Sequence, residues 1–458
     1  MAPDRGTEAL ERVFKAYDIR GTVPDQVDAD LARATGAAFV DVTGTDRLVL
    51  GHDMRPSSPE LAGAFADGAA AAGADVVSIG LAATDQLYFA SGRLDAPGAM
   101  FTASHNPAHY NGIKLCRSGA RPVGRDTGLM EIRDQVARGL TPAAPRRGTI
   151  TAQDVLGDYV EHLLELAPVR GRRLKVVVDA GNGMAGHTAP AVFARLGARQ
   201  VELVGLYLEL DGTFPNHEAN PIEPANLTDL RRRVVEEAAD AGLAFDGDAD
   251  RCFLVDERGE PVSPSTLTAL IADRELARVP GAAVIHNLLT SRAVPELVRE
   301  RGGRPVRTRV GHSFIKATMA ETDAVFGGEH SGHYYFRDFW RADSGMLAAL
   351  HTLAALAETT APLSELVGRY ERYCLSGEIN SSVPDPAEVI GRLRSAYDGR
   401  DGVTLDTLDG LSVIHEDWWF NVRPSNTEPL LRLNAEGRDP ATMERVRDDA
   451  LSLIRSHA

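Results

Sequence analysis

The sequence predicts an α/β protein built from several domains with mostly parallel sheets. Its 458 residues suffice for three or four domains of ordinary size. A short buried strand, a polar or glycine-rich loop and a helix follow one another three times along the chain, an order typical of parallel sheets. The strands are expected at 47–50, 174–178 and 282–285, and the helices at 58–72, 188–196 and 291–300.

Proline-rich segments mark the expected domain boundaries. Residues 140–148 combine prolines with arginines, and residues 383–386 hold two prolines. Together with the repeated pattern, they predict three α/β domains of similar size and a smaller fourth one. The predicted domains are 1–150, 151–253, 254–369 and 370–458.

The composition excludes several classes of protein. A formal net charge of −16 argues against nucleic acid or an anionic membrane as partner, so any phosphate must be held by local cations and backbone amides. The three cysteines are far apart and indicate a reducing compartment without disulfides. The N-terminus lacks an apolar signal core, and no apolar run has membrane-spanning length. A cytoplasmic location is therefore expected.

Lysine is rare in this chain. Only four of the 49 basic residues are lysines, namely Lys15, Lys114, Lys175 and Lys316. A lysine amine can lose its proton, which an arginine guanidinium does not do in proteins. Lys15, Lys114 and Lys316 fall in or beside the motifs described next.

The first motif surrounds Ser104. Residues 101–107 read Phe-Thr-Ala-Ser-His-Asn-Pro. Ser104 could act as a nucleophile there, with His105 or a nearby amine taking its proton. The esterase elbow Gly-x-Ser-x-Gly is absent at this serine. A capped turn is the alternative, because all four residues from Ser104 to Pro107 favour turns.

The second motif is acidic. Asp246, Asp248 and Asp250 alternate with small residues between two apolar stretches, and their mutual repulsion suits a bound Mg²⁺ or Ca²⁺. An EF-hand is disfavoured, because Arg251 stands where that loop requires glycine and the flanks look like strands. A solvated acidic turn is the other alternative. Arg251 beside the metal would suit a phosphate oxygen that bridges the two.

A glycine loop gives the strongest competing signal. Residues 181–186 read Gly-Asn-Gly-Met-Ala-Gly after an expected strand, which matches the dinucleotide fingerprint, and Glu202 follows at a suitable distance. Against a nucleotide-binding oxidoreductase, Asp179 would repel a pyrophosphate and the domain is short. A tight turn that lets helix and strand pack closely is the favoured interpretation.

Two further loops suit a phosphorylated sugar. In residues 327–333, Glu329 could accept hydrogen bonds from two sugar hydroxyls, while Ser331 and His333 add donors. The histidine spacing there does not favour zinc. In residues 423–429, an arginine, hydroxyls and an amide on a turn could cradle a phosphate, with a plain turn as the alternative. A segment at 14–21 places two cations near an aromatic ring.

Taken together, these segments resemble the α-D-phosphohexomutase family, and most closely its bacterial phosphomannomutase/phosphoglucomutase branch. The resemblance covers residues 12–440, with the motifs in the family's order. It implies four domains around a central cleft, three similar α/β units with mixed or parallel sheets and a smaller α+β C-terminal domain. One departure is that residues 286–289 read His-Asn-Leu-Leu, where some relatives have a lysine.

The resemblance also implies roles for individual residues. Ser104 would carry a phosphoryl group, and Mg²⁺ would be held by Asp246, Asp248, Asp250 and an oxygen of the phosphoserine. Glu329 and Ser331 would bind the sugar hydroxyls. The phosphate that does not react would be held by Arg423, Ser425, Asn426 and Thr427. The family positions near the reacting groups are Tyr17, Arg20, His105, Lys114, Arg251 and His312.

The implied reaction moves a phosphoryl group between O1 and O6 of a mannose or glucose phosphate through a 1,6-bisphosphate, which also serves as activator. Lys114 or His105 would act as general base or acid, tuned by Arg20. A phosphoglucosamine mutase and a sugar phosphatase that uses the same serine and metal are the alternatives. The chain is expected to be a monomer or homodimer, with no nucleic acid or membrane partner.

Overall fold

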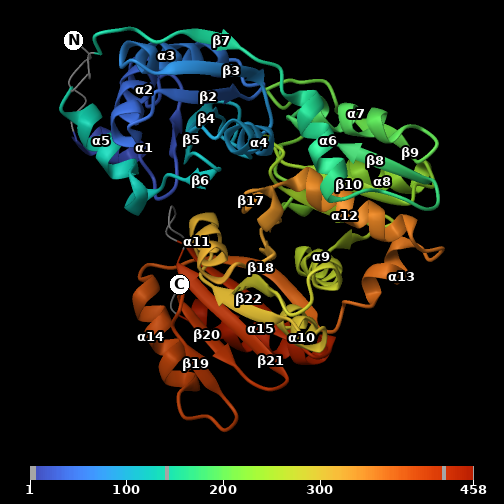
Figure 1. The fold of residues 1–458 in the computed structure, drawn as a ribbon. Helices are drawn as coiled ribbons and strands as arrows, with labels where there is room; N and C mark the ends of the chain where they lie inside the picture. The colour runs from blue at the N-terminus through green and yellow to red at the C-terminus, as the bar shows by residue number, and fades with distance from the viewer. Residues whose placement is uncertain (1–6, 140–143, 425–429, 457–458) are drawn as a thin grey trace. The chain divides into compact units, whose positions relative to one another are not determined.

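The computed structural model describes residues 7–139, 144–424 and 430–456. The chain divides into two compact units (Figure 1). Unit 1 comprises Met1–Pro264 and Ser331–Leu366, and unit 2 comprises Ser265–His330 and Val367–Ala458. None of the helices in the described ranges has the length and apolar content that crossing a bilayer requires.

The first sheet of unit 1 is mixed. Its strand order is β1-β5-β4-β2-β3-β7, and β6 pairs with β5. Strand β2 runs parallel to β3 and β4, whereas β5 runs antiparallel to β1 and β4. The strands are β1 (Ile19–Thr22), β2 (Arg47–His52), β3 (Asp75–Leu81), β4 (Gly98–Phe101), β5 (Tyr110–Arg117), β6 (Arg121–Pro122) and β7 (Ile150–Ala152).

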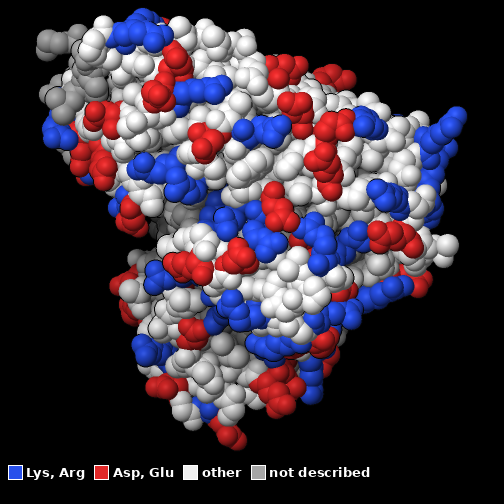
Figure 2. Space-filling view, in the orientation of Figure 1, with Lys and Arg blue, Asp and Glu red and all other residues white. Residues whose placement is uncertain are grey.

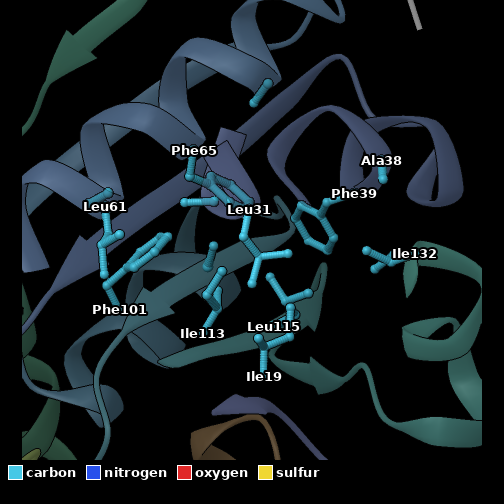
Figure 3. Close-up of a cluster of buried hydrophobic side chains, with 14 of the residues drawn as sticks. Ile19, Leu31, Ala38, Phe39, Leu61, Phe65, Phe101, Ile113, Leu115 and Ile132 are labelled. Carbon is cyan, nitrogen blue, oxygen red and sulfur yellow. The ribbon is translucent and has the colours of Figure 1, made fainter. Parts of the chain in front are cut away.

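Helices α2 (Ala29–Thr43) and α3 (Ser58–Ala71) cover one face of this sheet and enclose its core. Helix α2 begins where the Asp28 carboxylate accepts a hydrogen bond from the Leu31 amide at 2.9 Å. Figure 3 shows the core between these helices and the sheet. The rings of Phe65 and Phe101 meet edge-on there, with their centroids 5.6 Å apart. The other helices here are α1 (Thr7–Val13), α4 (Thr84–Leu94), η1 (Arg125–Thr127) and α5 (Leu129–Ala137).

The second sheet of unit 1 has the order β12-β11-β10-β8-β9. Strand β8 (Leu174–Asp179) runs parallel to β9 (Val201–Leu206) and β10 (Ala241–Phe245), and β11 (Cys252–Val255) turns back beside β10. The remaining elements of this unit are β12 (Pro261–Val262), β16 (Tyr334–Phe336), β17 (Ala342–Asp343), α6 (Leu156–Leu166), α7 (Ala185–Leu196), α8 (Thr228–Glu236), η2 (Pro224–Leu227), η3 (Arg337–Phe339) and α12 (Gly345–Ala357).

Unit 2 contains a parallel portion and an antiparallel sheet. Strand β13 (Ala283–Asn287) lies between β14 (Arg304–Thr308) and β15 (Phe326–Gly328), parallel to both. The other helices of this portion are α9 (Pro264–Arg278), α10 (Ala293–Glu300), α11 (His312–Thr322) and α13 (Leu363–Gly368). Of these, α9 and α13 extend across the bounds of the units, at Pro264 and Leu366.

The antiparallel sheet has the order β18-β22-β21-β20-β19. Helices α14 and α15 pack with it around one apolar core. Its elements are β18 (Cys374–Ser382), β19 (Thr404–Asp406), β20 (Leu411–Ile414), β21 (Trp418–Pro424), β22 (Leu430–Gly437), α14 (Pro386–Tyr397) and α15 (Pro440–Arg455). The predicted fold class, mixed α/β sheets followed by an α+β C-terminal part, is confirmed.

The expected strands at 47–50 and 174–178 coincide with β2 and β8, and the one at 282–285 with β13. Helix α7 begins three residues before its expected start at 188, because the chain turns into the helix directly from the glycine loop. On the surface, basic and acidic side chains are interspersed on the face that Figure 2 shows. Several arginines of the described structure are paired with carboxylates, as Arg372 is with Glu300 at 2.6 Å.

Candidate active site

Ser104 lies in a strained turn directly after β4. Its backbone φ is +49°, a left-handed value that is uncommon for residues other than glycine. The turn is held by hydrogen bonds from the Ser104 amide to Thr102 Oγ1 at 2.9 Å and from the Asn106 amide to the Ala103 carbonyl at 3.0 Å. Ser104 Oγ donates to Asp246 Oδ2 at 2.7 Å and lies 3.3 Å from His105 Nδ1. The nucleophile candidate therefore faces the acidic motif.

The acidic motif forms the turn between β10 and β11. Asp246, Asp248 and Asp250 are all buried, and they offer carboxylate oxygens that lie within 4.8 Å of one another. Oδ1 of Asp248 and Oδ1 of Asp250 are buried without a hydrogen-bond partner among the described residues. Unpartnered buried carboxylate oxygens at this spacing are what a hard cation requires. The three carboxylates can thus hold a metal ion.

Close backbone contact joins this turn to the serine turn. A Cβ at Gly247 would lie 2.3 Å from the Ser104 carbonyl oxygen, so only glycine fits there. Thr84, at the start of α4, adds a second tie, because its Oγ1 donates to Asp248 Oδ2 at 2.6 Å. The metal-binding turn is therefore fixed against the segment that carries the serine.

Cations surround the carboxylates. Lys114 Nζ on β5 lies 2.6 Å from Asp248 Oδ2 and 2.5 Å from Asp250 Oδ2. Arg251 donates from Nε to Asp246 Oδ2 at 2.9 Å. Arg20 on β1 donates to Asn106 Oδ1 at 2.7 Å, which places its guanidinium beside the serine turn. Three cationic side chains predicted from the sequence thus gather around Ser104 and the acidic turn.

The protonation states follow from burial and these charges. Burial raises the pKa of Asp246 to about 6, and Asp250 and Asp248 add to the shift while Arg251 opposes it. Burial lowers the pKa of His105 well below 6.5, and Arg251 and Arg20 lower it further. Burial alone would lower the pKa of Lys114, but Asp248 and Asp250 outweigh it and raise that pKa well above its usual value.

His333 also belongs to this site. Its Nδ1 lies 2.9 Å from Asp343 Oδ2 and 3.7 Å from Asp250 Oδ1, and its backbone pairs with Arg251. Burial lowers the pKa of the imidazole, but Asp250 and Asp343 outweigh this effect and raise it. The sequence predicts that His333 binds the sugar, whereas the structure places it next to Asp250, a candidate metal ligand.

The other predicted site residues belong to unit 2, to other segments of unit 1 or to positions outside the described residues. Tyr17 is half-buried in the turn before β1, and Ser331 lies two residues before His333. In unit 2, Glu329 is buried, and its Oε1 accepts from Asn287 Nδ2 at 3.2 Å and from the Gly311 amide at 3.1 Å. The positions outside the described residues are Ser425, Asn426, Thr427 and the side chain of His312.

Arg423, at the end of β21, has an acidic neighbour. Its Nη2 lies 3.4 Å from Glu378 Oε2. Burial lowers the pKa of the Arg423 guanidinium, and Glu378 partly opposes this shift. A phosphate bound by Arg423 would have to compete with Glu378.

The glycine loop of residues 181–186 is a packing turn. The Gly183 amide donates to the Ala180 carbonyl at 2.7 Å and the Met184 amide donates to the Gly247 carbonyl at 2.9 Å. A Cβ at Gly186 would lie 2.1 Å from the Leu208 carbonyl oxygen. These amides are already bonded to the backbone, so they do not form a pyrophosphate cradle. The favoured interpretation of this loop as a tight turn agrees with the structure.

Arg55 is the functional residue that the sequence analysis missed. Its fully buried guanidinium donates to the carbonyls of Ser104, Asn106, Pro107 and Tyr110 at 2.6–3.0 Å. Its Nε lies 3.2 Å from Asp53 Oδ2. In the sequence, Asp53 and Arg55 stand out as a charged pair directly after the first predicted strand. No neighbouring residue indicates that Arg55 binds the carbonyls of the Ser104 turn.

Comparison with known proteins gives the family. Four family models match, described as phosphoglucomutase/phosphomannomutase alpha/beta/alpha domains I (residues 11–142), II (157–259) and III (263–373) and the C-terminal domain (378–453). A phosphomannomutase of Escherichia coli is 40% identical over 451 residues, which covers 96% of this chain and 99% of the relative. A phosphohexose mutase of Xanthomonas campestris is 42% identical over 442 residues, covering 96% and 98%.

A solved structure agrees with this result. The crystal structure of a phosphoglucomutase/phosphomannomutase family protein from Burkholderia thailandensis matches with a TM-score of 0.88 and 36% identity, covering 97% of this chain and 98% of that one. All four domain models and full-length relatives thus point the same way. The chain therefore belongs to the phosphoglucomutase/phosphomannomutase family, and it is a phosphohexomutase that transfers a phosphoryl group on hexose phosphates.

Proposed function

We propose that Ser104 carries the phosphoryl group and passes it between O1 and O6 of mannose and glucose phosphates through a 1,6-bisphosphate. The observation that carries this assignment is the 2.7 Å contact between Ser104 Oγ and Asp246 Oδ2. It brings a buried hydroxyl in a strained turn against a carboxylate cluster that can hold a cation. Phosphoryl transfer needs this positioning and charge neutralisation.

In the forward half-reaction, the P–O bond to Ser104 Oγ breaks and a bond to the free sugar hydroxyl forms. The hydroxyl proton leaves to a base, for which the neutral His105 is the candidate, whereas Lys114, whose pKa is raised, is the candidate acid. The bisphosphate then turns end over end, and Ser104 takes back the other phosphoryl group. Arg251 and Arg20 supply positive charge beside the transferring group.

We assign Mg²⁺ to Asp246, Asp248 and Asp250, with an oxygen of the phosphoserine as a further ligand. Oxygen donors at three buried carboxylates suit this ion. When bound, Mg²⁺ offsets the negative charge on the phosphoryl oxygens. Lys114, which already bridges Asp248 and Asp250, keeps these two side chains oriented toward one another.

For the sugar, we propose that Glu329 and Ser331 bind hydroxyls and that Arg423, Ser425, Asn426 and Thr427 hold the unreactive phosphate. Contacts from Asn287 and Gly311 fix the Glu329 carboxylate, which suits it to accept hydrogen bonds in a defined geometry. In the sequence, Ser425, Asn426 and Thr427 follow Arg423 closely, and their side chains carry hydroxyl and amide groups that can bind a phosphate.

The test is a coupled assay of mannose 1-phosphate and glucose 1-phosphate with Mg²⁺ and a trace of the 1,6-bisphosphate. Ser104→Ala should abolish formation of the 6-phosphates, because no other group takes over the covalent step. Ser118→Ala, which alters a serine outside the site, is the matched control and should keep full activity. Full activity in Ser104→Ala would refute the assignment. Release of inorganic phosphate in place of the 6-phosphates would indicate a phosphatase, and turnover of glucosamine 1-phosphate alone would change the substrate.

A further inference from the structure

Unit 2 contains a pocket that the proposed reaction does not use. Its volume is about 340 Å³, within the range of small-molecule sites. One wall comes from β13, α10 and β14 and the other from β20 and β21. We call it the His286 pocket, and the lining residues used below are His286, Asn287, Arg292, Arg299, Arg307 and Trp419.

The pocket is basic although the chain is acidic. Three arginines line it, and none of its described lining residues is a carboxylate. Arg292 Nε lies 3.2 Å from Oε1 of Glu436, which does not line the pocket, and Arg307 pairs with Asp406. Among the described residues, the Arg299 guanidinium makes one hydrogen bond, at 3.4 Å to the Pro295 carbonyl. The guanidinium of Arg299 is therefore the one available to an anion.

His286 and Trp419 complete the walls. His286 is 7% exposed, and its Nδ1 lies 3.2 Å from the Asn287 carbonyl. Burial lowers the pKa of this imidazole to about 4, and the positive charges of Arg307 and Arg299 add to the shift, so the ring is neutral at pH 7. The buried Trp419 is fixed by a 2.7 Å hydrogen bond from Nε1 to Glu436. It offers a flat apolar surface beside the cations.

We propose that the His286 pocket binds a small phosphate monoester, with its phosphate at Arg299 and a planar or apolar body against Trp419. Guanidinium groups bind phosphate through several N–H donors. A sugar body is disfavoured, because the pocket lacks the carboxylates that accept hydrogen bonds from sugar hydroxyls. This ligand class separates the pocket from the Glu329 site.

The pocket is linked to the sugar-binding candidate through one side chain. Asn287 lines the pocket, and its Nδ2 donates to Glu329 Oε1 at 3.2 Å. A ligand that shifts Asn287 would move a hydrogen bond that holds the Glu329 carboxylate. Occupancy of the pocket is therefore expected to change the affinity for hexose phosphate.

The test is a titration of the full chain with phenyl phosphate, observed by NMR of ¹⁵N-labelled tryptophan side chains. The chain has three tryptophans, and Trp419→Phe assigns the relevant indole signal. We expect a saturable shift of the Trp419 signal, with affinity reduced about tenfold by Arg299→Gln, because one charge-assisted contact is lost. Arg304→Gln, an arginine on β14 outside the pocket, is the matched control and should leave the affinity unchanged.

Three outcomes would overturn the proposal. The first is no saturable shift, and the second is an equal affinity in Arg299→Gln. The third is an equal response to phenol. Phenol lacks the phosphate, so an equal response would mean that the pocket binds only the apolar ring. A response that is lost in Arg423→Gln but kept in Arg299→Gln would mean that the probe binds at Arg423 and not in the His286 pocket. The readout needs no turnover, so it stands or falls separately from the mutase assignment.

Discussion

The guanidinium of Arg55 donates from Nη2 to the backbone carbonyl of Ser104 at 2.9 Å. The same guanidinium bonds the carbonyls of Asn106, Pro107 and Tyr110, and Asp53 neutralises its charge. One fully buried side chain thereby satisfies four carbonyls of the turn that carries the nucleophile. Buried carbonyls without partners are costly, so Arg55 stabilises the strained conformation of Ser104.

Arg55→Lys is therefore expected to impair catalysis more than substrate binding. An ammonium keeps the charge but lacks the planar fork of donors that reaches all four carbonyls. A displaced nucleophile lowers kcat by about 100-fold, while the Kd for hexose phosphate, measured by calorimetry, should stay unchanged. Arg47→Lys, at the exposed start of β2, is the control. Wild-type kcat in a folded Arg55→Lys enzyme would contradict the positioning role.

The acidic turn predicts a metal-dependent stability. Mg²⁺ that binds the folded chain at 100 times its Kd adds about 2.7 kcal/mol to the free energy of unfolding. Asp248→Asn removes one of three ligands and should abolish this increase, as measured by thermal unfolding with Mg²⁺ and with a chelator. Glu260→Gln changes an exposed carboxylate near the same sheet and should keep the increase. An equal Mg²⁺ response in Asp248→Asn would place the ion elsewhere.

Local patterns carried most of the sequence predictions. The strand at 47–50 and the carboxylates Asp246, Asp248 and Asp250 could be found because strand, turn and ligand spacing are all encoded within a few residues. Their partners could not be found in this way. Lys114 is 134 residues from Asp248, and Arg55 is 49 residues from Ser104. Such pairs meet only when distant segments fold together, as Lys114 of the first sheet and Asp248 beside the second sheet do, and a local sequence pattern does not encode this contact.

Two glycines of α3 test how closely α2 and α3 pack. A Cβ at Gly68 would lie 1.9 Å from the Arg33 carbonyl oxygen, whereas a Cβ at Gly63 would meet nothing within 4 Å. Gly68→Ala should destabilise the chain by about 1–3 kcal/mol, because the helices must move apart. Gly63→Ala should stabilise it by about 0.5–1 kcal/mol through helix propensity. Urea unfolding of the two variants checks this, and changes of the same sign would contradict the packing.

A buried carboxylate beneath the site predicts a pH-dependent stability. Asp85, in the first turn of α4, accepts hydrogen bonds from Tyr159 Oη at 2.7 Å and Ser344 Oγ at 2.6 Å. Burial raises its pKa from 3.8 to about 7, although both hydroxyls oppose the shift. The folded chain therefore binds more protons than the unfolded chain between pH 4 and 7. The contribution of Asp85 to the free energy of unfolding therefore falls as the pH rises from 4 to 7.

Asp85→Asn removes the ionisation but keeps an acceptor for the two hydroxyls. The difference between 3.8 and about 7 corresponds to about 4 kcal/mol as an upper bound, so the variant should be more stable than wild type at pH 8. The free energies of unfolding of Asp85→Asn and wild type should approach each other at pH 4. Asp158→Asn, an exposed change next to Tyr159, should shift the unfolding free energy by less than about 0.5 kcal/mol at either pH. Urea unfolding at pH 4, 6 and 8 checks this, and a variant less stable than wild type at pH 8 would mean that Asp85 is ionised and stabilising in the fold.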